Sequence, residues 1–393
     1  MIKLQTRRFL IWFFHQIAVK LFHYGILLAR YEHAFGHQAW NLEYLARRYH
    51  YLYGKTPTII AFQRSSFVPN ISLLAHHRRA GIRIISERHW LSRCFRAARS
   101  ACKNVPLALP ISNIDENKFI YCRFTMDDLH TDTTVDPSPI AFPLLAEAKA
   151  RANTFLEKFD LKEEGYFCFQ DRTTLYKSYI KSSMKEGFDE PNSFDSARNT
   201  TIEDMHAGID TLHSFGLRAV RLGVHPVSAA INKNIVDYAS QRDAADSFGD
   251  IALMNQCKFF AGPNSGLWLL ARAFNRPVCL INVFPWPWIN LPLGKNSLVM
   301  PKKLWLKSDK RLLNIREMAK MEETFKWKYF YNQLSFLELG IEVVDNTPDE
   351  IMNAFVEINK RLDNLWEGPT IPVSRYLSTN NIACKSDSLF PAF

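Results

Sequence analysis

The sequence predicts an α/β protein with two Rossmann-like domains facing a cleft, preceded by an amphipathic N-terminal helix. Short apolar runs alternate with helix-patterned segments in both halves of the 393-residue chain, as in parallel α/β sheets. Residues 257–282, CKFFAGPNSGLWLLARAFNRPVCLIN, read as strand, tight polar turn, helix and strand. Such a βαβ unit places its turn at the carboxyl end of a strand, where open sheets bind ligands.

The first element in chain order is a helix expected within residues 1–23, whose apolar face lies beside Arg7 and Arg8. Such a helix can lie in a membrane interface, and packing against the protein's own core is the alternative. A membrane-spanning anchor is disfavoured because Lys20 falls inside the apolar stretch. There is no cleavage-site pattern of a secretory signal.

Positive charge is concentrated at the N-terminal end. Residues 1–100 hold 16 Lys and Arg and 3 Asp and Glu, whereas the whole chain has a net charge of +10. This favours an anionic membrane surface or an acidic acceptor as partner, or a solvated basic face. We expect no nucleic-acid partner, because no nucleic-acid-binding motif accompanies the charge. Seven scattered cysteines indicate reduced thiols and a cytoplasmic protein.

The first domain is expected over residues 24–145. Its apolar runs predict strands at 24–29, 58–62 and 82–85, with helices at 40–49 and 70–79 and irregular chain over 103–140. Gly36 would let the chain turn sharply after the first strand. His37 or Glu32 would then face the cleft, where either is suited to accept a proton, although a loop histidine is more often not catalytic.

The second domain is expected over residues 146–345, followed by a helix at 346–366 and a tail at 367–393. The same reasoning predicts strands at 166–169, 217–222, 235–237, 257–261, 277–281 and 340–344, and helices at 143–159, 202–215, 251–255 and 267–274. The segment 283–340 is aromatic and is read as irregular. The last helix is expected to cross back between the two domains.

Basic and polar residues follow the strands of the second domain. Arg172 comes just after a strand, and Arg198 lies in the loop that returns to the same rim, so both are candidates to grip a diphosphate. Small residues in the turn, including Asn264, Ser265 and Gly266, would add backbone N–H groups at a helix start. The structural alternatives are an ion pair of Arg172 with Asp171, and Asn199 as a helix cap.

Four further residues are candidates to bind the nucleotide or sugar of such a ligand: Arg221, Asp237, Tyr238 and Asp250. Arg221 ends a strand, and Asp237 is placed to orient an arginine or to bind a sugar hydroxyl. Asp250 as a helix N-cap is the simpler interpretation. The one acidic pair considered as a metal site, Asp127 and Asp128, lacks partners at ligand spacing, so no metal and no cofactor are expected.

These motifs occur in an order that resembles a family of bacterial glycosyltransferases of surface-polysaccharide loci, of the GT-B type. The sequence is more distantly similar to fucosyltransferases, through Gly36-His37-Gln38 and Gln170-Asp171-Arg172, and to heptosyltransferases, through the turn at 262–266. It departs from them at Gln170, where fucosyltransferases have His, and at Asn264, where heptosyltransferases have Asp. The donor sugar therefore does not carry over.

The resemblance implies metal-independent, inverting transfer of a sugar from a nucleotide-diphosphate donor to a glycan or lipid-linked acceptor. It places the enzyme in the cytoplasm, peripheral to the inner membrane, with Arg172, Arg198 and the turn at 263–266 on the leaving diphosphate. Two alternatives stay open. One is a nucleotide-sugar epimerase of the same architecture, and the other is a non-catalytic protein that binds an acidic polymer.

Overall fold

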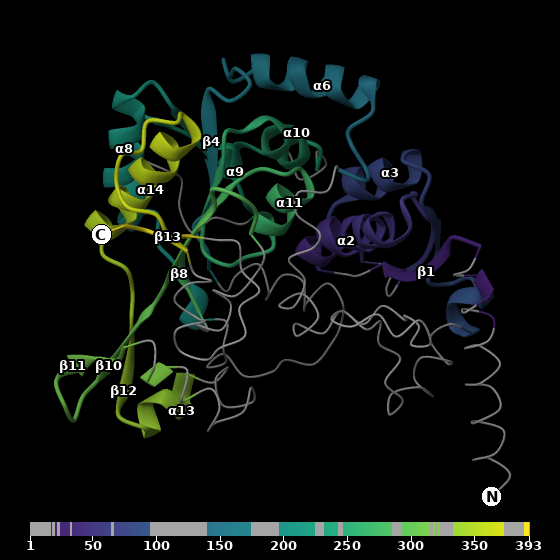
Figure 1. The fold of residues 1–393 in the computed structure, drawn as a ribbon. Helices are drawn as coiled ribbons and strands as arrows, with labels where there is room; N and C mark the ends of the chain where they lie inside the picture. The colour runs from purple at the N-terminus through teal and green to yellow at the C-terminus, as the bar shows by residue number, and fades with distance from the viewer. Residues whose placement is uncertain are drawn as a thin grey trace, which may run out of the picture. The chain divides into compact units, whose positions relative to one another are not determined.

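The chain divides into two compact units, Met1–Leu145 and Ala146–Phe393 (Figure 1). This computed structural model describes residues 24–31, 34–63, 67–94, 140–173, 196–224, 232–242, 247–284, 293–314, 333–372 and 389–392, with a few isolated positions besides. The helix expected within residues 1–23 lies outside these ranges. Within them, no helix is long and apolar enough to cross a membrane.

The first unit contains a parallel sheet in the order β1-β2-β3, formed by β1 (Ile26–Tyr31), β2 (Thr58–Gln63) and β3 (Arg83–Ile85). Its helices are α2 (Phe35–Tyr53) and α3 (Ile71–Arg79). Local chemistry sets their ends. Gly54 ends α2 with φ of 67°, a conformation that glycine adopts without steric cost, and the Asn70 side chain caps α3 by accepting from the Leu73 N–H.

Apolar residues of β1, β2 and α2 form the core of this unit, and a buried carboxylate lies at its edge. Glu43 of α2 accepts from Arg47 Nε at 2.6 Å and from the backbone N–H groups of Ala141 and Phe142 at 2.6 and 3.0 Å. His76 of α3 contacts the Phe142 carbonyl at 3.0 Å. The segment at 141–142 is thus bound to the first unit by two buried polar side chains.

The second unit is built on an eight-stranded sheet in the order β13-β14-β9-β8-β7-β4-β5-β6. The strands from β14 to β6 are parallel, and only β13 pairs antiparallel at the edge. Their bounds are β4 (Tyr166–Phe169), β5 (Arg218–Arg221), β6 (Ile235–Val236), β7 (Phe260–Gly262), β8 (Val278–Val283), β9 (Leu298–Pro301), β13 (Ile371–Pro372) and β14 (Leu389–Phe390).

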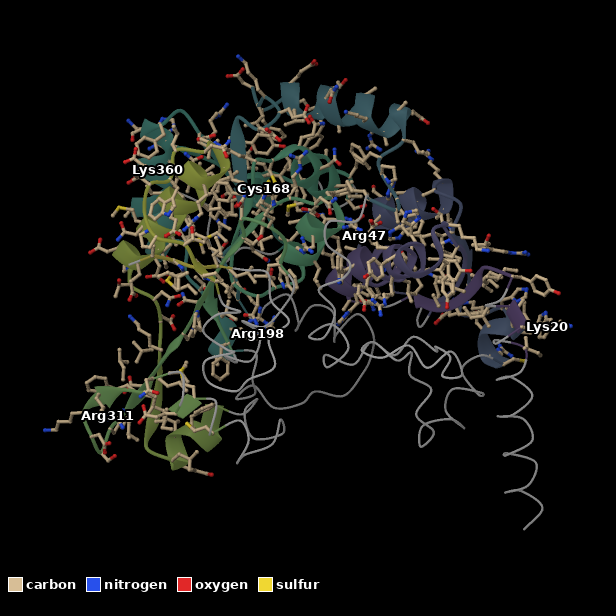
Figure 2. All side chains as sticks on the ribbon, viewed as in Figure 1. Lys20, Arg47, Cys168, Arg198, Arg311 and Lys360 are labelled. Atoms are coloured by element: carbon tan, nitrogen blue, oxygen red, sulfur yellow. The ribbon has the colours of Figure 1, made fainter. Side chains whose placement is uncertain are left out.

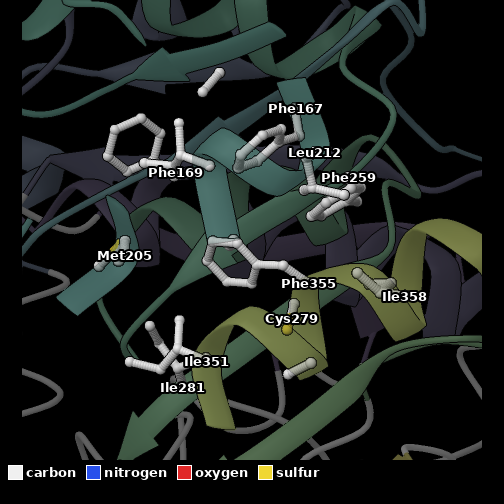
Figure 3. Close-up of a cluster of buried hydrophobic side chains, with 14 of the residues drawn as sticks. Phe167, Phe169, Met205, Leu212, Phe259, Cys279, Ile281, Ile351, Phe355 and Ile358 are labelled. Atoms are coloured by element: carbon white, nitrogen blue, oxygen red, sulfur yellow. The ribbon is translucent and has the colours of Figure 1, made fainter. Parts of the chain in front are cut away.

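Helices cover both faces of this sheet (Figure 1). On one face lie α8 (His206–Ser214) and α14 (Pro348–Leu362). Their apolar side chains meet those of the strands in a core where Phe167 stacks on Phe259 and Phe355 packs edge-on (Figure 3). On the other face lie α10 (Gly249–Gln256) and α11 (Leu267–Ala273), with α6 (Ala146–Glu157) packed on α10. The short helix α9 (Tyr238–Gln241) follows β6.

A small antiparallel sheet extends from the end of β9. It has the order β11-β10-β12, with β10 (Lys303–Leu306), β11 (Arg311–Leu312) and β12 (Ile341–Val344), and α13 (Gln333–Glu338) packs beside β12. Figure 1 shows it apart from the large sheet, below α8 and α14. The prediction of irregular chain over 283–340 was therefore wrong, because the strands there are only two to four residues long and too short to show an alternating pattern.

The mixed α/β class and the parallel sheets are confirmed, and four local expectations need correction. Gly36 is not a turn residue but lies buried in the first turn of α2. The last helix, α14, packs on α8 within the second unit. The tail adds β13 and β14 to the sheet. Asn199 does not cap a helix, because its side chain accepts from Arg172. The cysteines in the described ranges, Cys94, Cys168, Cys257 and Cys279, are free thiols.

Candidate functional site

The candidate site lies at the carboxyl edge of the second unit's sheet, where the strand order reverses. From β4 the chain first builds outward to β5 and β6, then returns to the other side of β4 and continues through β7, β8 and β9. The connections after β4 and β7 therefore leave the sheet in opposite directions. In open α/β sheets this switch point is where ligands bind.

Gly262, the last residue of β7, lets the two strands meet closely at the switch point. Its φ is 149°, and a Cβ atom there would lie 2.8 Å from the carbonyl oxygen of Gln170. Any other residue would therefore clash with the backbone that follows β4. The close approach brings the chain after Gln170 and the turn at 263–266 side by side.

A short segment, residues 198–200, crosses this edge, and two arginine side chains lie on it or bind it. The segment pairs with the end of β4 through two backbone hydrogen bonds between Arg172 and Thr200, of 3.0 and 3.2 Å. Arg172 Nη1 donates to Asn199 Oδ1 at 3.0 Å, and Arg198 Nη2 donates to the carbonyl of Asn264. Both arginines are buried. Figure 2 shows Arg198 beyond the end of the sheet, with Cys168 inside it.

Lys302 adds a third cation that the sequence analysis missed. It follows β9, and its Nζ donates to the Asn199 carbonyl at 3.1 Å and to Asp345 Oδ1 at 2.5 Å. Burial lowers the pKa of Lys302 and the charge of Arg172 lowers it further, while Asp345 opposes both. The signal available in the sequence was a lysine two positions after the apolar run at 298–300. It was overlooked because the run was not recognised as a strand.

In the turn between β7 and α11, side-chain groups are engaged within the protein. Asn264 is fully buried, its Nδ2 donates to the carbonyl of Phe284 at 2.8 Å, and its Oδ1 accepts from the Phe284 N–H at 3.5 Å. Ser265 Oγ accepts from the Leu267 N–H at 3.3 Å, and Gly266 is the N-cap of α11. Because α11 has only seven residues, its dipole is small, and the full positive charges near this edge are those of Arg172, Arg198 and Lys302, the last of which is paired with Asp345.

Arg221 is bound by two carboxylates beneath this edge. Its Nε and Nη2 donate to both oxygens of Asp171 at 2.7 and 2.8 Å, and its Nη1 lies 3.4 Å from Asp237 Oδ2. Burial lowers the pKa of Arg221, but the bonds to Asp171 and the charges of both carboxylates outweigh this and raise it. Asp171 therefore pairs with Arg221 rather than with Arg172, and Asp237 orients an arginine, as one interpretation of the sequence held.

Tyr238 and Asp250 have internal contacts. Tyr238 packs edge-on against the rings of Phe155 and Phe159, and a Cβ at Gly249 would overlap its hydroxyl. Asp250 is not an N-cap, because α10 begins one residue earlier, at Gly249. Its carboxylate instead accepts from Arg242 Nη1 at 3.1 Å.

Three polar atoms near the switch point have no hydrogen-bond partner among the residues that the structure describes. They are Gln170 Oε1, directly after β4, Thr200 Oγ1, beside Arg172, and Trp268 Nε1, in the first turn of α11. The side chains of Thr200 and Trp268 are buried. Burying such a group without a hydrogen bond costs about 1–3 kcal/mol, so these atoms are suited to bind a polar ligand.

In the first unit, the structure places His37 on α2, where its Nδ1 is buried without a hydrogen-bond partner in the described ranges. Glu32 and the acidic pair Asp127 and Asp128 lie outside those ranges. Within the part of the chain that is described, no three histidine, cysteine or acidic side chains gather at metal-binding distance.

No protein-family model matches the sequence, and no curated protein matches it. Several solved structures share a distant likeness. ADP-heptose lipopolysaccharide heptosyltransferase II of E. coli is 15% identical, with 86% of this chain and 98% of that chain covered and a TM-score of 0.40. A family 9 glycosyltransferase of Veillonella parvula is 12% identical, with 81% and 77% covered and a TM-score of 0.32.

The iron-containing dodecameric glycosyltransferase TibC of enterotoxigenic E. coli is also 12% identical, with 65% of this chain and 57% of that chain covered and a TM-score of 0.29. At these values the likeness is remote. The fold assignment therefore rests on the chain's own sheet topology.

Proposed function

We propose that the chain is a glycosyltransferase whose second unit binds a nucleotide-diphosphate sugar. The observation that carries this is a group of three cations at the sheet's switch point: Arg172 and Lys302 both donate to Asn199, and the adjacent Arg198 donates to the carbonyl of Asn264. A diphosphate carries closely spaced negative oxygens, and guanidinium groups bind such oxygens in pairs. The orphan polar atoms at Gln170, Thr200 and Trp268 provide further contacts for the rest of the donor.

In this proposal the cations also stabilise the transition state. Negative charge develops on the leaving diphosphate as the bond to the sugar breaks, and fixed positive groups lower the barrier at that point. The transfer then needs no metal and proceeds with inversion. Because an inverting transfer deprotonates the incoming hydroxyl, His37 or Glu32 of the first unit serves as the general base.

The acceptor in this proposal is a glycan or a lipid-linked glycan of a surface polysaccharide, and the enzyme works at the cytoplasmic face of the inner membrane. The excess of 16 basic over 3 acidic residues within residues 1–100 supports a membrane surface rich in anionic lipids. Removing residues 1–22 should then release the protein from anionic vesicles in a sedimentation assay. Equal sedimentation of the shortened chain would contradict this part of the proposal.

Calorimetric titration with ADP, GDP, UDP and CDP tests the donor site. Arg172→Ala and Arg198→Ala should each weaken binding of the preferred nucleotide about 10- to 100-fold, since a hydrogen bond to a charged group contributes about 1.5–3 kcal/mol. The matched control is Arg218→Ala, because Arg218 begins β5 at the opposite edge of the sheet and donates to the carbonyls of Phe159 and Asp160. Unchanged affinity in both site variants would refute the diphosphate site.

Turnover distinguishes transfer from epimerisation. With the matching nucleotide sugar, the proposed enzyme releases nucleoside diphosphate faster when an acceptor glycan is present, and it does so in EDTA. An epimerase would convert the sugar without any acceptor and release no nucleotide. A different outcome is binding to an acidic polymer that depends strongly on salt and is unchanged in the arginine variants. That result would favour a non-catalytic binding protein.

A further inference from the structure

The first two turns of α2 contain an unusual group of buried polar atoms. Gln38 is 1% exposed and Asn41 is 7% exposed. Both amide atoms of Gln38, the Oδ1 of Asn41 and the Nδ1 of His37 have no hydrogen-bond partner among the residues that the structure describes. Buried amides are nearly always hydrogen-bonded in folded proteins, so an unpaired group of this size calls for an explanation.

These side chains share one end of the helix. Residue 41 lies three positions after 38 and four after 37, so its side chain is a neighbour of both on the helix surface. Side chains on a helix lean toward its N-terminus, so all three are directed at the first turn of α2.

The helix end itself offers donors. Its first internal hydrogen bond runs from the Gln38 N–H to the Ala34 carbonyl. The N–H groups of residues 35–37 therefore lie before the i to i−4 hydrogen bonds of the helix. Ala34, the N-cap, makes no side-chain cap bond, and the first turn has no acidic residue. This end follows β1 directly, at the carboxyl edge of the first unit's sheet.

The chemistry of these groups selects the ligand. The amide of Gln38 presents one acceptor and one pair of donors side by side, and Asn41 adds a second acceptor. A phosphate or carboxylate would match the donors but would leave both acceptor oxygens facing a like-charged group. Each hydroxyl of a neighbouring pair donates one hydrogen bond and also accepts, so the pair can bind an amide in both directions.

We propose that the first turns of α2 form a carbohydrate subsite, in which Gln38 and Asn41 bind a vicinal diol. Only the role given to this subsite, which is to hold the acceptor sugar, rests on the proposed function. Binding itself needs no nucleotide. Because the amide atoms are buried in the free chain, a sugar must displace covering groups or ordered water, which keeps its affinity for a single ring in the millimolar range.

The experiment uses the full chain and saturation-transfer NMR with methyl α-D-mannopyranoside, which carries a vicinal diol. The comparison probes are 2-methoxytetrahydropyran, which has the ring without hydroxyls, and inorganic phosphate. We expect transfer to the mannoside alone, with a loss of at least tenfold in Gln38→Met. Asn41→Leu, which is the second variant, should weaken the signal in the same direction.

Thermal unfolding of the same variants separates a binding role from a structural one. Gln38→Met keeps the shape and removes two unpaired polar atoms, so its Tm should rise by at least about 2 °C. The matched control is Asn70→Ala, which removes a buried amide oxygen that is bonded to the Leu73 N–H at 2.7 Å. Its Tm should fall while its mannoside signal stays at the parent level.

Several results would overturn the subsite. They are no mannoside signal from the parent chain, an undiminished signal in both variants, Gln38-dependent binding of phosphate in place of the mannoside, or a Tm that falls in Gln38→Met. If only ordered water binds these atoms, the parent chain gives no mannoside signal, which is the first of these results. If no nucleoside diphosphate binds while the mannoside signal persists and depends on Gln38, the donor proposal fails and the subsite stands.

Discussion

Arg221 illustrates how single residues hold the edge on which the donor site is proposed. Its guanidinium bridges Asp171, which follows β4, and Asp237, which follows β6, so one side chain ties together the ends of three neighbouring strands. Asp237 also caps α9 by accepting from the Ser240 N–H at 3.2 Å. The residues beside Arg172 are thereby fixed before any ligand arrives.

Arg221→Ala should lower the free energy of unfolding by about 3–5 kcal/mol, because it leaves Asp171 and Asp237 without their buried partner. Urea unfolding followed by circular dichroism measures this. Lys307→Ala is the control, since its contact with Glu342 is 3.9 Å long and both side chains are more than half exposed. A surface pair of this kind contributes less than about 1 kcal/mol. Equal losses in the two variants would contradict the bridging role.

At the scale of elements, β7 and α14 depend on local backbone chemistry. Gly262 allows the contact between β7 and the chain after β4, and Thr347 begins α14 with a capping box that includes Glu350. Lys303 of β10 binds the same Glu350 carboxylate at 2.8 and 3.0 Å. The start of α14 is therefore also the point where the small antiparallel sheet is held to the rest of the second unit.

Gly262→Ala should destabilise the second unit more than Gly216→Ala does. Both glycines have positive φ, at 149° and 83°, so both variants pay a backbone strain of about 1–2 kcal/mol or more. Only at Gly262 does the added Cβ also collide with a backbone carbonyl, whereas Gly216 has open space around it. Chemical denaturation of the two variants gives the comparison, and a smaller loss for Gly262→Ala would be inconsistent with the close approach of β4 and β7.

The cap of α14 should make stability pH-dependent. Burial raises the pKa of Glu350, but the bonds from Lys303 and from the Thr347 N–H outweigh it, so the pKa is lowered from its ordinary 4.5. A lowered carboxylate pKa stabilises the fold above pH 4.5, and this stabilisation disappears as pH falls through the folded-state value. The gap in unfolding free energy between the parent and Glu350→Gln should therefore narrow below pH 4.5. A gap that is constant from pH 7 to pH 3 would show that the charge of Glu350 contributes nothing.

At the scale of the whole molecule, each unit has a core of its own. The cluster around Phe167 and Phe355 draws only on residues of the second unit, and the cluster around Leu42 and Tyr49 only on those of the first. Domains with separate cores commonly fold alone.

A fragment of residues 146–393 should therefore unfold cooperatively, and it should bind the preferred nucleoside diphosphate within about threefold of the full chain's affinity. Scanning calorimetry and titration of the isolated fragment test the two parts. A fragment that shows no cooperative transition would mean that the second unit needs the first. A folded fragment without nucleotide affinity would mean that the first unit contributes to the donor site.

The sequence was informative where a local pattern decides the structure. The run at 257–282 predicted β7, α11 and β8 with small errors at their ends. Arg172 and Arg198 were predicted to share one rim because Arg172 follows a strand and Arg198 lies in the loop that returns to it, and the structure pairs the chain at Arg172 with Thr200. The sequence was uninformative where long-range packing decides. Nothing local in the segment around Lys302 indicates that β9 lies beside β8, and nothing near Asn264 indicates that its side chain binds Phe284, twenty residues away.

The bonds of Glu43 and His76 to residues 141–142 also determine where the gene can be cut and rejoined. A hybrid that joins this first unit to a foreign second unit before residue 140 would replace residues 141–142, and Glu43 would keep its two N–H donors only if the foreign backbone followed the same path. A junction between residues 143 and 146 keeps that anchor intact and leaves α6 whole. Recombination of this chain with others of similar architecture should therefore yield folded hybrids more often from a junction at 143–146 than from one before residue 140.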